Sequence, residues 1–401
     1  MTPDPTSQTA SREPSQETLN ETSDEQDENG PTSSPAADST ADVAHDPAGA
    51  LGQLLGGFRA TQAIHVAARL GLVDMLRDGP RTSQALADRV GAHEPSLRRL
   101  LGFLTTLGVL AQDGEGHFLT TPVGDLLRAD HPESERPWAL LLGAPAIWRP
   151  WGSLYEAVVT GRPAFEQVYG EPFFSYLGHD PAQAALFNAA MSSDTANIGE
   201  VLDAYDFSGA GIIVDIGGGH GALLRGILER APQARGILFD LPAVVAEAEA
   251  EAEAERAGKP VAEDAALAST LVPTAEPEIE PEYERVGGDM FASVPAGGDL
   301  YVLKRIVHDW SDAEAIQILR NCREAMIPHG KVLLIESIRQ PARQADPATA
   351  ADLMMLALVT GRERTEAEFR GLLAAAGFRL TRIIPAGQRS LIEAVSEVAT
   401  A

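Results

Sequence analysis

The hydrophobic pattern from residue 209 onward alternates between two kinds of segment. Short apolar runs such as GIIVDIG, RGILFDL, DLYVLKRI and KVLLIES are typical of strands buried in a parallel sheet. Segments such as ALLRGILERA and SDAEAIQILRNCREAM have the apolar spacing of helices instead. With ERVGGDM, RLTRII and SLIEAVS as further strands, the pattern predicts seven strands in all. The fold expected for residues 209–401 is therefore an α/β domain with a doubly wound, Rossmann-like sheet.

The first half of the chain has a predominantly helical pattern. Residues 51–76 and the segments TSQALADRVG and EPSLRRLLGFLTTLGVL have helical spacing, with Thr82 and Ser83 as candidate N-caps and Gly91 as a helix end. The segment HFLTTPVGDLL then has the pattern of a β-wing followed by a helix. We predict a mainly helical winged-helix domain over residues 48–132. A helical, aromatic-rich linker that contributes to a substrate pocket is predicted over residues 133–208.

A winged helix allows two interpretations. In a DNA-binding regulator, EPSLRRLL would occupy the position of the recognition helix, but Arg98 and Arg99 are almost its only basic residues. Its leucines, by contrast, predict an extended apolar face that a protein surface would cover: Leu97, Leu100, Leu101, Leu104 and Leu107. We favour a dimerisation domain and a homodimer, and keep the DNA-binding regulator as a remote alternative.

The acidic residues concentrate in two segments of low complexity. The net charge is −27, and residues 1–47 carry eleven acidic side chains against Arg12 alone. Residues 246–284 carry twelve against Arg256 and Lys259. We predict a disordered acidic tail over 1–47 and a partly disordered acidic insertion over about 246–282. Because a phosphate backbone repels such acidity, no nucleic-acid partner is expected.

Composition also limits the cellular compartment and the kinds of metal site that are expected. No apolar run approaches the roughly 18 residues that span a bilayer, and no signal-peptide pattern is visible. The single cysteine, Cys322, excludes an internal disulfide and a multi-cysteine zinc site. We expect a cytoplasmic protein that uses no membrane and no metal.

The turn GGGHG after the run GIIVDI predicts a site for an adenosine-containing ligand. Gly217 and Gly219 lie between a strand and a helix, where free N–H groups and close backbone approach favour ligand binding. Asp240 follows about twenty residues later, at the position where a carboxylate binds ribose hydroxyls. The glycines also fit a dinucleotide pattern. Asp215 decides between the two, because its charge would repel a pyrophosphate and attract a sulfonium and an α-ammonium group. We therefore predict S-adenosylmethionine.

Six motifs occur in one order along the chain: VDIGGGHG, FDLP, GGDMFASVP, LKRIVHDWSD, GKVLLIES and GRERTEAEFRGLLAAAGF. This order resembles the S-adenosylmethionine-dependent O-methyltransferases of small phenolics, which include plant caffeate-type enzymes and bacterial enzymes that tailor aromatic polyketides. The resemblance covers roughly residues 50–397. It implies transfer of a methyl group to a hydroxyl of a small aromatic substrate.

The resemblance also implies cofactor contacts at matching positions. The glycine turn would meet the methionine portion and Asp240 the ribose. Asp289 would bond the adenine amino group, with Met290 and Phe291 packed on the ring. Lys304 would lie near the carboxylate of the cofactor.

His308 is the candidate catalytic base. It follows the strand DLYVLKRI, at the carboxyl end where open α/β sheets place their sites, and histidine titrates near neutrality. A histidine base needs an acceptor on its second nitrogen. We expect Glu336, at the end of KVLLIES, to supply it. Glu363 matches the second acidic partner of the family, although a glutamate between Arg362 and Arg364 could equally form a surface ion pair. Asp309 is expected to bond locally.

The substrate pocket follows from apolar positions in regions that line the acceptor site in the family. The candidates are Trp148, Phe187, Met191, Asp194, Met354 and Leu358. An apolar stripe at helical spacing is as often core, so both interpretations stay open. A second reaction also stays open, because some relatives bind S-adenosylmethionine yet hydroxylate or decarboxylate. The complete set of His308, Glu336 and Glu363 favours methyl transfer.

Overall fold

The computed structural model describes residues 46–193, 195–256, 283–340 and 346–397. The chain divides into two compact units, residues 1–56 and 57–401. In the first unit the described helix is α2 (Pro47–Leu55), which Asp46 caps by accepting a hydrogen bond from the Gly49 N–H at 2.9 Å. The predicted tail lies outside the described residues up to residue 45. Of the predicted insertion, residues 246–256 form the end of helix α16 (Pro242–Arg256), and residues 257–282 lie outside the described ones.

The second unit begins with the predicted winged helix. Thr82 caps α5 by accepting from the Ala85 N–H at 3.1 Å, and Gly91 ends that helix in the left-handed region with a φ of 65°. Ser83 is not the cap, because it is already inside the helix and donates to Glu94 at 2.5 Å. The elements in order are α3 (Gly57–Arg69), α4 (Leu72–Leu76), α5 (Ser83–Val90), α6 (Glu94–Thr106), β1 (Leu110–Gln112) and β2 (Phe118–Thr120). The strands β1 and β2 pair in antiparallel fashion as the wing.

The apolar face of α6 does not lie open to a partner. Leu97, Leu101 and Leu104 are buried in the core of the winged helix, and Leu100 and Leu107 are half-buried against it. The expectation that all five leucines form an interaction face is therefore wrong. The reason is that the small domain needs this stripe to form its own core.

The linker region is helical, and six of its aromatic side chains gather into one cluster. The rings of Phe165, Tyr169, Phe173, Phe174, Tyr176 and Phe187 pack with centroids 4.6 to 6.0 Å apart, mostly edge to face. We call these six residues the aromatic cluster. Helix α7 (Pro122–Asp125) follows the wing, and the helices of the linker are α8 (Arg136–Gly143), α9 (Pro145–Trp148), α10 (Leu154–Thr160), α11 (Ala164–Tyr169), α12 (Phe173–Leu177), α13 (Pro181–Ser192) and α14 (Thr195–Ala204). A 3₁₀ turn, Arg149–Ser153, joins α9 to α10.

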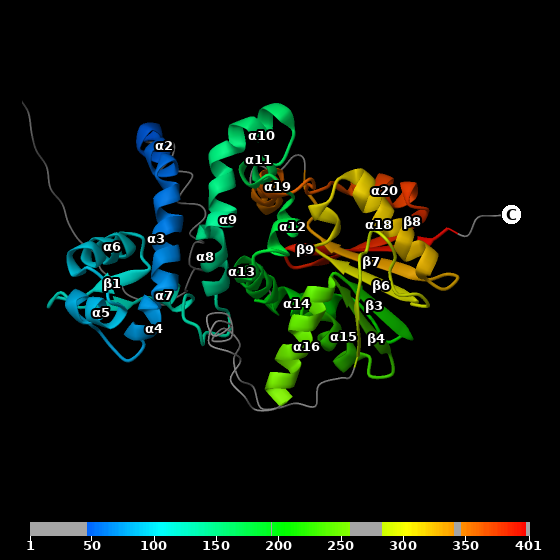
Figure 1. Ribbon diagram of the computed structural model, residues 1–401, viewed down its shortest axis with the longest axis horizontal. Helices are drawn as coiled ribbons and strands as arrows, with labels where there is room; N and C mark the ends of the chain where they lie inside the picture. Colours follow the sequence, from blue (N-terminus) through cyan, green and yellow to red (C-terminus); the bar gives the residue numbers. More distant parts are fainter. Residues whose placement is uncertain (1–45, 194, 257–282, 341–345, 398–401) are drawn as a thin grey trace, which may run out of the picture. The chain divides into compact units, whose positions relative to one another are not determined.

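The seven predicted strands form one sheet in the order β5-β4-β3-β6-β7-β9-β8. Strands β3 to β7 are parallel, and β9 is antiparallel to both β7 and β8 (Figure 1). The strands are β3 (Ile212–Ile216), β4 (Arg235–Asp240), β5 (Glu284–Gly287), β6 (Leu300–Lys304), β7 (Lys331–Glu336), β8 (Phe378–Ala386) and β9 (Arg389–Ser396). Helices α15 (Ala222–Arg230), α18 (Asp312–Ala325) and α20 (Glu366–Ala375) also pack against the sheet. Helix α19 (Pro347–Leu358) lies between β7 and α20 in the chain and packs with α10 and α11 instead.

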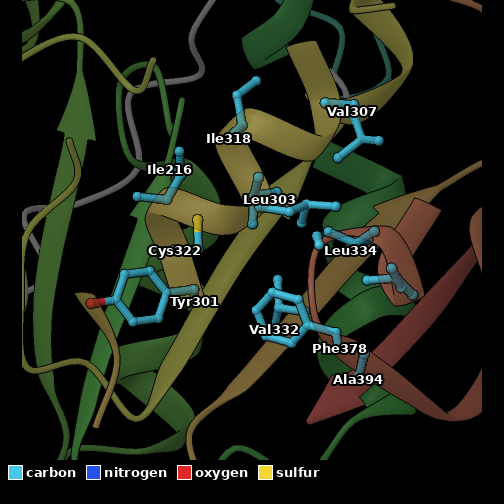
Figure 2. Packing of buried hydrophobic residues seen from close by; sticks show 14 of the residues in the cluster. Ile216, Tyr301, Leu303, Val307, Ile318, Cys322, Val332, Leu334, Phe378 and Ala394 are labelled. Atoms are coloured by element: carbon cyan, nitrogen blue, oxygen red, sulfur yellow. The ribbon is translucent and has the colours of Figure 1, made fainter. Parts of the chain in front are cut away.

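Both faces of the sheet are buried. Helices α18 and α20 cover one face, where Leu303 and Leu334 meet Ile318 and Cys322 of α18 (Figure 2). Helices α14 and α15 cover the other, against Ile213 and its neighbours. This two-sided burial explains why the strands read as continuous apolar runs. It leaves the loops at the carboxyl ends of the parallel strands as the place for chemistry.

Candidate active site

The turn between β3 and α15 strongly favours glycine at its tightest positions. Gly217 and Gly219 have φ values of 66° and 57°, in the left-handed region. A Cβ atom at Gly217 would also collide with the side chain of Ile306. At Gly219 a Cβ atom would meet nothing within 4 Å, so this part of the turn is open. The Gly219 N–H donates to Asp240 Oδ2 at 2.8 Å.

Asp240 is held by backbone donors on both carboxylate oxygens. Besides Gly219, the Leu241 N–H donates to Oδ1 at 2.7 Å. Burial raises the pKa of Asp240, against the lowering effect of these two bonds and of His220. Each oxygen keeps a lone pair for a further donor, as a ribose hydroxyl would be.

Asp215 is a buried carboxylate with an unsatisfied oxygen. Its side chain is 1% exposed, and Oδ2 has no hydrogen-bond partner among the described residues. Burial raises the pKa of Asp215 to about 7, while the charge of Lys304 on the neighbouring strand lowers it. A buried, unsatisfied carboxylate is costly until a cation or a donor binds it. The group therefore fits the cationic end of S-adenosylmethionine.

The segment after β5 is fixed by hydrogen bonds to its backbone. Asp289 Oδ1 accepts from the Phe291 N–H at 2.9 Å, and the Met290 carbonyl accepts from Asn321 of α18 at 2.7 Å. Asp289 is exposed, and Met290 and Phe291 are half-buried. Phe291 packs edge-on to Trp310 with centroids 4.7 Å apart. Two apolar side chains beside an accessible carboxylate suit an adenine ring and its amino group.

His308 lies in a 3₁₀ turn, Val307–Asp309, two residues after the end of β6. The ring is 4% exposed, and its Nδ1 lies 2.8 Å from Glu363 Oε1. Nε2 lies 3.4 Å from Asp309 Oδ1. Glu363 is itself 2% exposed. The alternative of a surface ion pair for Glu363 is therefore wrong.

Glu336 does not make the hydrogen bond that the sequence suggested. It is fully buried at the end of β7, and its Oε1 accepts from the Val307 N–H at 2.9 Å. Its Oε2 has no partner among the described residues. The register of β6 and β7 brings this carboxylate to the backbone of the turn, and the imidazole points to Glu363 instead. Glu336 thus supports the turn, and Glu363 contacts the ring.

The charges around His308 favour its imidazolium form. Burial lowers the pKa of His308, but Asp309, Glu336 and Glu363 outweigh it and raise the pKa to about 9, with Arg305 acting against them. Burial in turn raises the pKa of Glu336 to about 7. At neutral pH the free protein therefore holds a protonated His308 beside carboxylates that stabilise it.

Three residues of this region were missed by the sequence analysis. Arg305 has a φ of 55°, unusual for a non-glycine residue, and its guanidinium lies 5.6 Å from the Trp138 ring centroid. Trp310 stacks on Phe174 of the aromatic cluster with centroids 5.3 Å apart. Arg364 is completely buried. Their positions within LKRIVHDWSD and GRERT were the available signal.

Of the residues predicted to line the substrate pocket, four lie together in the structure and one lies apart. Phe187 and Met191 of α13, with Met354 and Leu358 of α19, belong to the apolar group that includes the aromatic cluster. Leu358 is buried at 5% exposure, and the other three are half-buried. Trp148 is half-buried at the end of α9 and does not belong to this group. Asp194 lies outside the described residues.

The described residues contain neither a candidate membrane span nor a candidate metal cluster. None of the helices described is both long and apolar enough to cross a membrane. In the same part of the chain, no three His, Cys, Asp or Glu side chains are grouped so as to hold a metal ion.

Comparison with known proteins identifies the family. Residues 151–276 and 260–379 match the O-methyltransferase domain, and residues 52–130 match the O-methyltransferase dimerisation domain. The phenazine O-methyltransferase PhzM of Lysobacter antibioticus is 40% identical over 344 residues, which cover 85% of this chain and 94% of that protein. The chain belongs to the O-methyltransferase family. It is an O-methyltransferase, and the methyl donor of the family is S-adenosylmethionine.

Solved structures of similar O-methyltransferases share the fold. The mitomycin 7-O-methyltransferase MmcR superposes with a TM-score of 0.76 at 35% identity, covering 91% of this chain and 100% of that one. NcsB1, an O-methyltransferase of neocarzinostatin biosynthesis solved with S-adenosylmethionine and 2-hydroxy-5-methyl naphthoic acid, gives a TM-score of 0.69 at 32% identity. The match covers 84% of this chain and 96% of NcsB1. In this O-methyltransferase the winged helix lies within the residues that match the dimerisation domain, and strands β3 to β7 lie within the residues that match the O-methyltransferase domain.

Proposed function

We propose that this O-methyltransferase transfers the methyl group of S-adenosylmethionine to a hydroxyl of a small aromatic acceptor, with His308 as general base. The observation that carries the proposal is the 2.8 Å contact between His308 Nδ1 and Glu363 Oε1 in a buried site. A buried histidine that is oriented by a carboxylate is the usual arrangement of a catalytic base. The relatives that act on phenazine, mitomycin and naphthoate scaffolds support an aromatic acceptor.

The protonation of the histidine follows from its partners. Because the group at Nδ1 is a carboxylate, Nδ1 carries a proton, and Nε2 is left to take the proton of the acceptor hydroxyl. Asp309, 3.4 Å from Nε2, stabilises the imidazolium that forms. The neutral form is the base, so proton abstraction gains as pH approaches the pKa of about 9.

The remaining residues bind and orient. We assign Asp215 to the cationic end of the donor, Asp240 to the ribose, and Asp289, Met290 and Phe291 to the adenine, with Lys304 near the donor carboxylate. Bound S-adenosylmethionine supplies an electrophilic methyl group on its sulfonium. Trp310 and the half-buried rings of the aromatic cluster, Phe187 among them, offer flat apolar surfaces for the acceptor, with Met191 and Met354 beside them. Alignment of the acceptor oxygen is the main contribution expected of these surfaces.

The test is incubation with methyl-labelled S-adenosylmethionine and a panel of phenols, anthracyclinones and flavonoids, followed by mass spectrometry. The gain of one labelled methyl group on a hydroxyl supports the proposal. Transfer of the methyl group to an amine would show that the acceptor atom is nitrogen and would contradict the proposed hydroxyl acceptor. The gain of oxygen or the loss of carbon dioxide would favour a tailoring enzyme that binds S-adenosylmethionine but hydroxylates or decarboxylates its substrate without transferring the methyl group. Parallel reactions with His308→Ala separate base catalysis from alignment alone.

We further propose that the dimerisation domain forms a homodimer. Helix α2 has no buried residue, although Leu54 and Leu55 are 78% and 70% exposed. A helix with this sequence gains stability only when another surface covers it. The double variant Leu54→Asp/Leu55→Asp should shift light-scattering mass toward the monomer. Ile327→Asp, at an exposed position after α18, is the matched control. Binding of genomic DNA fragments in a gel shift at low salt would instead support the alternative that the winged helix belongs to a DNA-binding regulator.

A further inference from the structure

Arg364 is the largest side chain that is completely buried among the described residues, and the hydrogen bonds of its guanidinium lead to the segment that carries His308 and to Asp312 just after it. Its NH1 donates to the Val307 carbonyl at 2.7 Å, and its NH2 donates to the Trp310 carbonyl at 2.8 Å. Its Nε and NH2 also donate to Asp312 Oδ1 at 3.0 and 2.8 Å. The guanidinium therefore joins both ends of the turn in which His308 lies.

Arg364 also follows Glu363 directly, so one stretch of backbone carries the guanidinium and the carboxylate that contacts the imidazole. This stretch is anchored on its own side, because the Glu363 N–H donates to Asp352 Oδ1 at 2.9 Å and the Arg364 carbonyl accepts from the Arg339 N–H at 2.9 Å. Two residues before Glu363, a Cβ atom at Gly361 would collide with the backbone of His308 and Asp309. The two segments are thus in direct backbone contact.

We propose that Arg364 is a positioning residue that sets the distance between His308 and Glu363. The inference rests on the proposed function for its effect on turnover. A plain ion pair with Asp312 does not explain the burial of Arg364, because Asp312 is half exposed and already pairs with Arg362 at 3.0 Å. What distinguishes Arg364 from Arg362 is that it also donates hydrogen bonds to two loop carbonyls, those of Val307 and Trp310. Only a planar guanidinium reaches three acceptors in fixed directions, so lysine is not an equivalent residue here.

The first experiment compares Arg364→Lys with Arg362→Met. Arg362 pairs with Asp312 and Glu368 in the same stretch, but it makes no bond to the loop carbonyls. Since a misplacement of about 1 Å can cost about 100-fold in rate, Arg364→Lys should lower kcat on the order of tenfold to a hundredfold. Its KM for the donor and its affinity for S-adenosylhomocysteine by calorimetry should stay unchanged, and Arg362→Met should behave like wild type.

The second measurement needs no turnover. In histidine-labelled protein, the His308 ring signal is assigned by its loss in His308→Ala and is titrated by NMR in the free enzyme. The hydrogen bond that the His308 ring donates to Glu363 raises the pKa of His308, so a longer contact in Arg364→Lys should lower its titration midpoint, while Arg362→Met keeps it. A folded Arg364→Lys with an unchanged midpoint overturns the positioning role, whatever reaction the enzyme performs. A changed midpoint with unchanged turnover supports the positioning role and overturns His308 as the base.

A third variant covers the case in which Arg364→Lys does not fold. Asp312→Ala removes the anchor of the guanidinium from the solvent side, at a half-exposed position away from the reacting atoms. We expect a smaller change of the His308 midpoint in the same direction. An unchanged midpoint in folded Asp312→Ala would contradict the proposal.

Discussion

Glu363 Oε1 and His308 Nδ1 lie 2.8 Å apart although 55 positions separate the two residues in the chain. The contact joins the turn after β6 to the segment before α20, so it exists only when the domain is folded. Asp309 and Glu336 add their charges from the turn and from the end of β7, which makes His308 a strongly basic imidazole.

The pH dependence of kcat/KM should report this environment. The pKa of His308 is raised to about 9 in the free enzyme, and only the neutral ring is a base. We expect kcat/KM to rise with pH and to level off near pH 9, in initial-rate measurements with an acceptor whose own ionisation lies outside the range. Glu363→Gln should shift the rise to lower pH, because a neutral amide stabilises the imidazolium less. A profile that is flat from pH 6 to 9 would contradict the assignment.

Removal of the imidazole should affect rate more than cofactor binding. General-base catalysis contributes on the order of 10² to 10⁴ in rate, so His308→Ala should lower kcat by that order. S-adenosylhomocysteine affinity should change little, since Gly219, Asp240 and Asp289 are unaltered. Near wild-type turnover in His308→Ala would show that alignment alone accounts for the rate.

The two glutamates should differ in effect. Glu363→Ala removes the acceptor at Nδ1 and should lower kcat on the order of tenfold to a hundredfold, as second-layer partners of a functional group typically do. Glu336→Gln should do much less, because its amide oxygen can still accept from the Val307 N–H and its pKa of about 7 already makes the neutral form common. Steady-state rates with matched melting temperatures test the order. Equal losses would contradict the separate roles.

Donor selectivity should depend on two carboxylates near the glycine turn, the buried Asp215 and the half-buried Asp240. Calorimetry should show binding of S-adenosylhomocysteine and no measurable binding of NAD. Asp240→Ala should weaken the binding of S-adenosylhomocysteine, because the ribose hydroxyls lose their acceptor and the Gly219 N–H loses its hydrogen-bond partner. Asp240→Asn is the control that keeps an acceptor oxygen and should weaken binding less. Comparable affinity for NAD would overturn the assignment.

Acid stability should depend on Glu393, which is 4% exposed in β9. Burial raises its pKa, but hydrogen bonds from Tyr205, Thr381 and Arg382 outweigh it and lower the pKa to about 2. Its contribution is present above the ordinary glutamate pKa and is lost as pH falls toward 2. Glu393→Gln should lower the free energy of unfolding at neutral pH by about 1–3 kcal/mol. The exposed Glu397→Gln should be neutral in the same urea titration, and equal midpoints for both variants would refute this role.

The sequence by itself determined the secondary structure and the cofactor turn. The seven strands, the wing and the glycines with positive φ are local properties, because apolar spacing and conformational freedom act between neighbours in the chain. The motif order was likewise enough to indicate the family that the comparisons identified.

Only the tertiary structure decided which side chains meet. The end of β7 brings Glu336 close to His308, as strand order predicts, yet its carboxylate bonds to the Val307 backbone and Glu363 contacts the ring. The leucines of α6 likewise pack into the core of their own domain, because a small domain must bury its apolar helix faces to be stable. Periodicity specifies the face on which a side chain lies. Its partner depends on how loops from distant segments approach each other, as Arg364 does at the turn of His308.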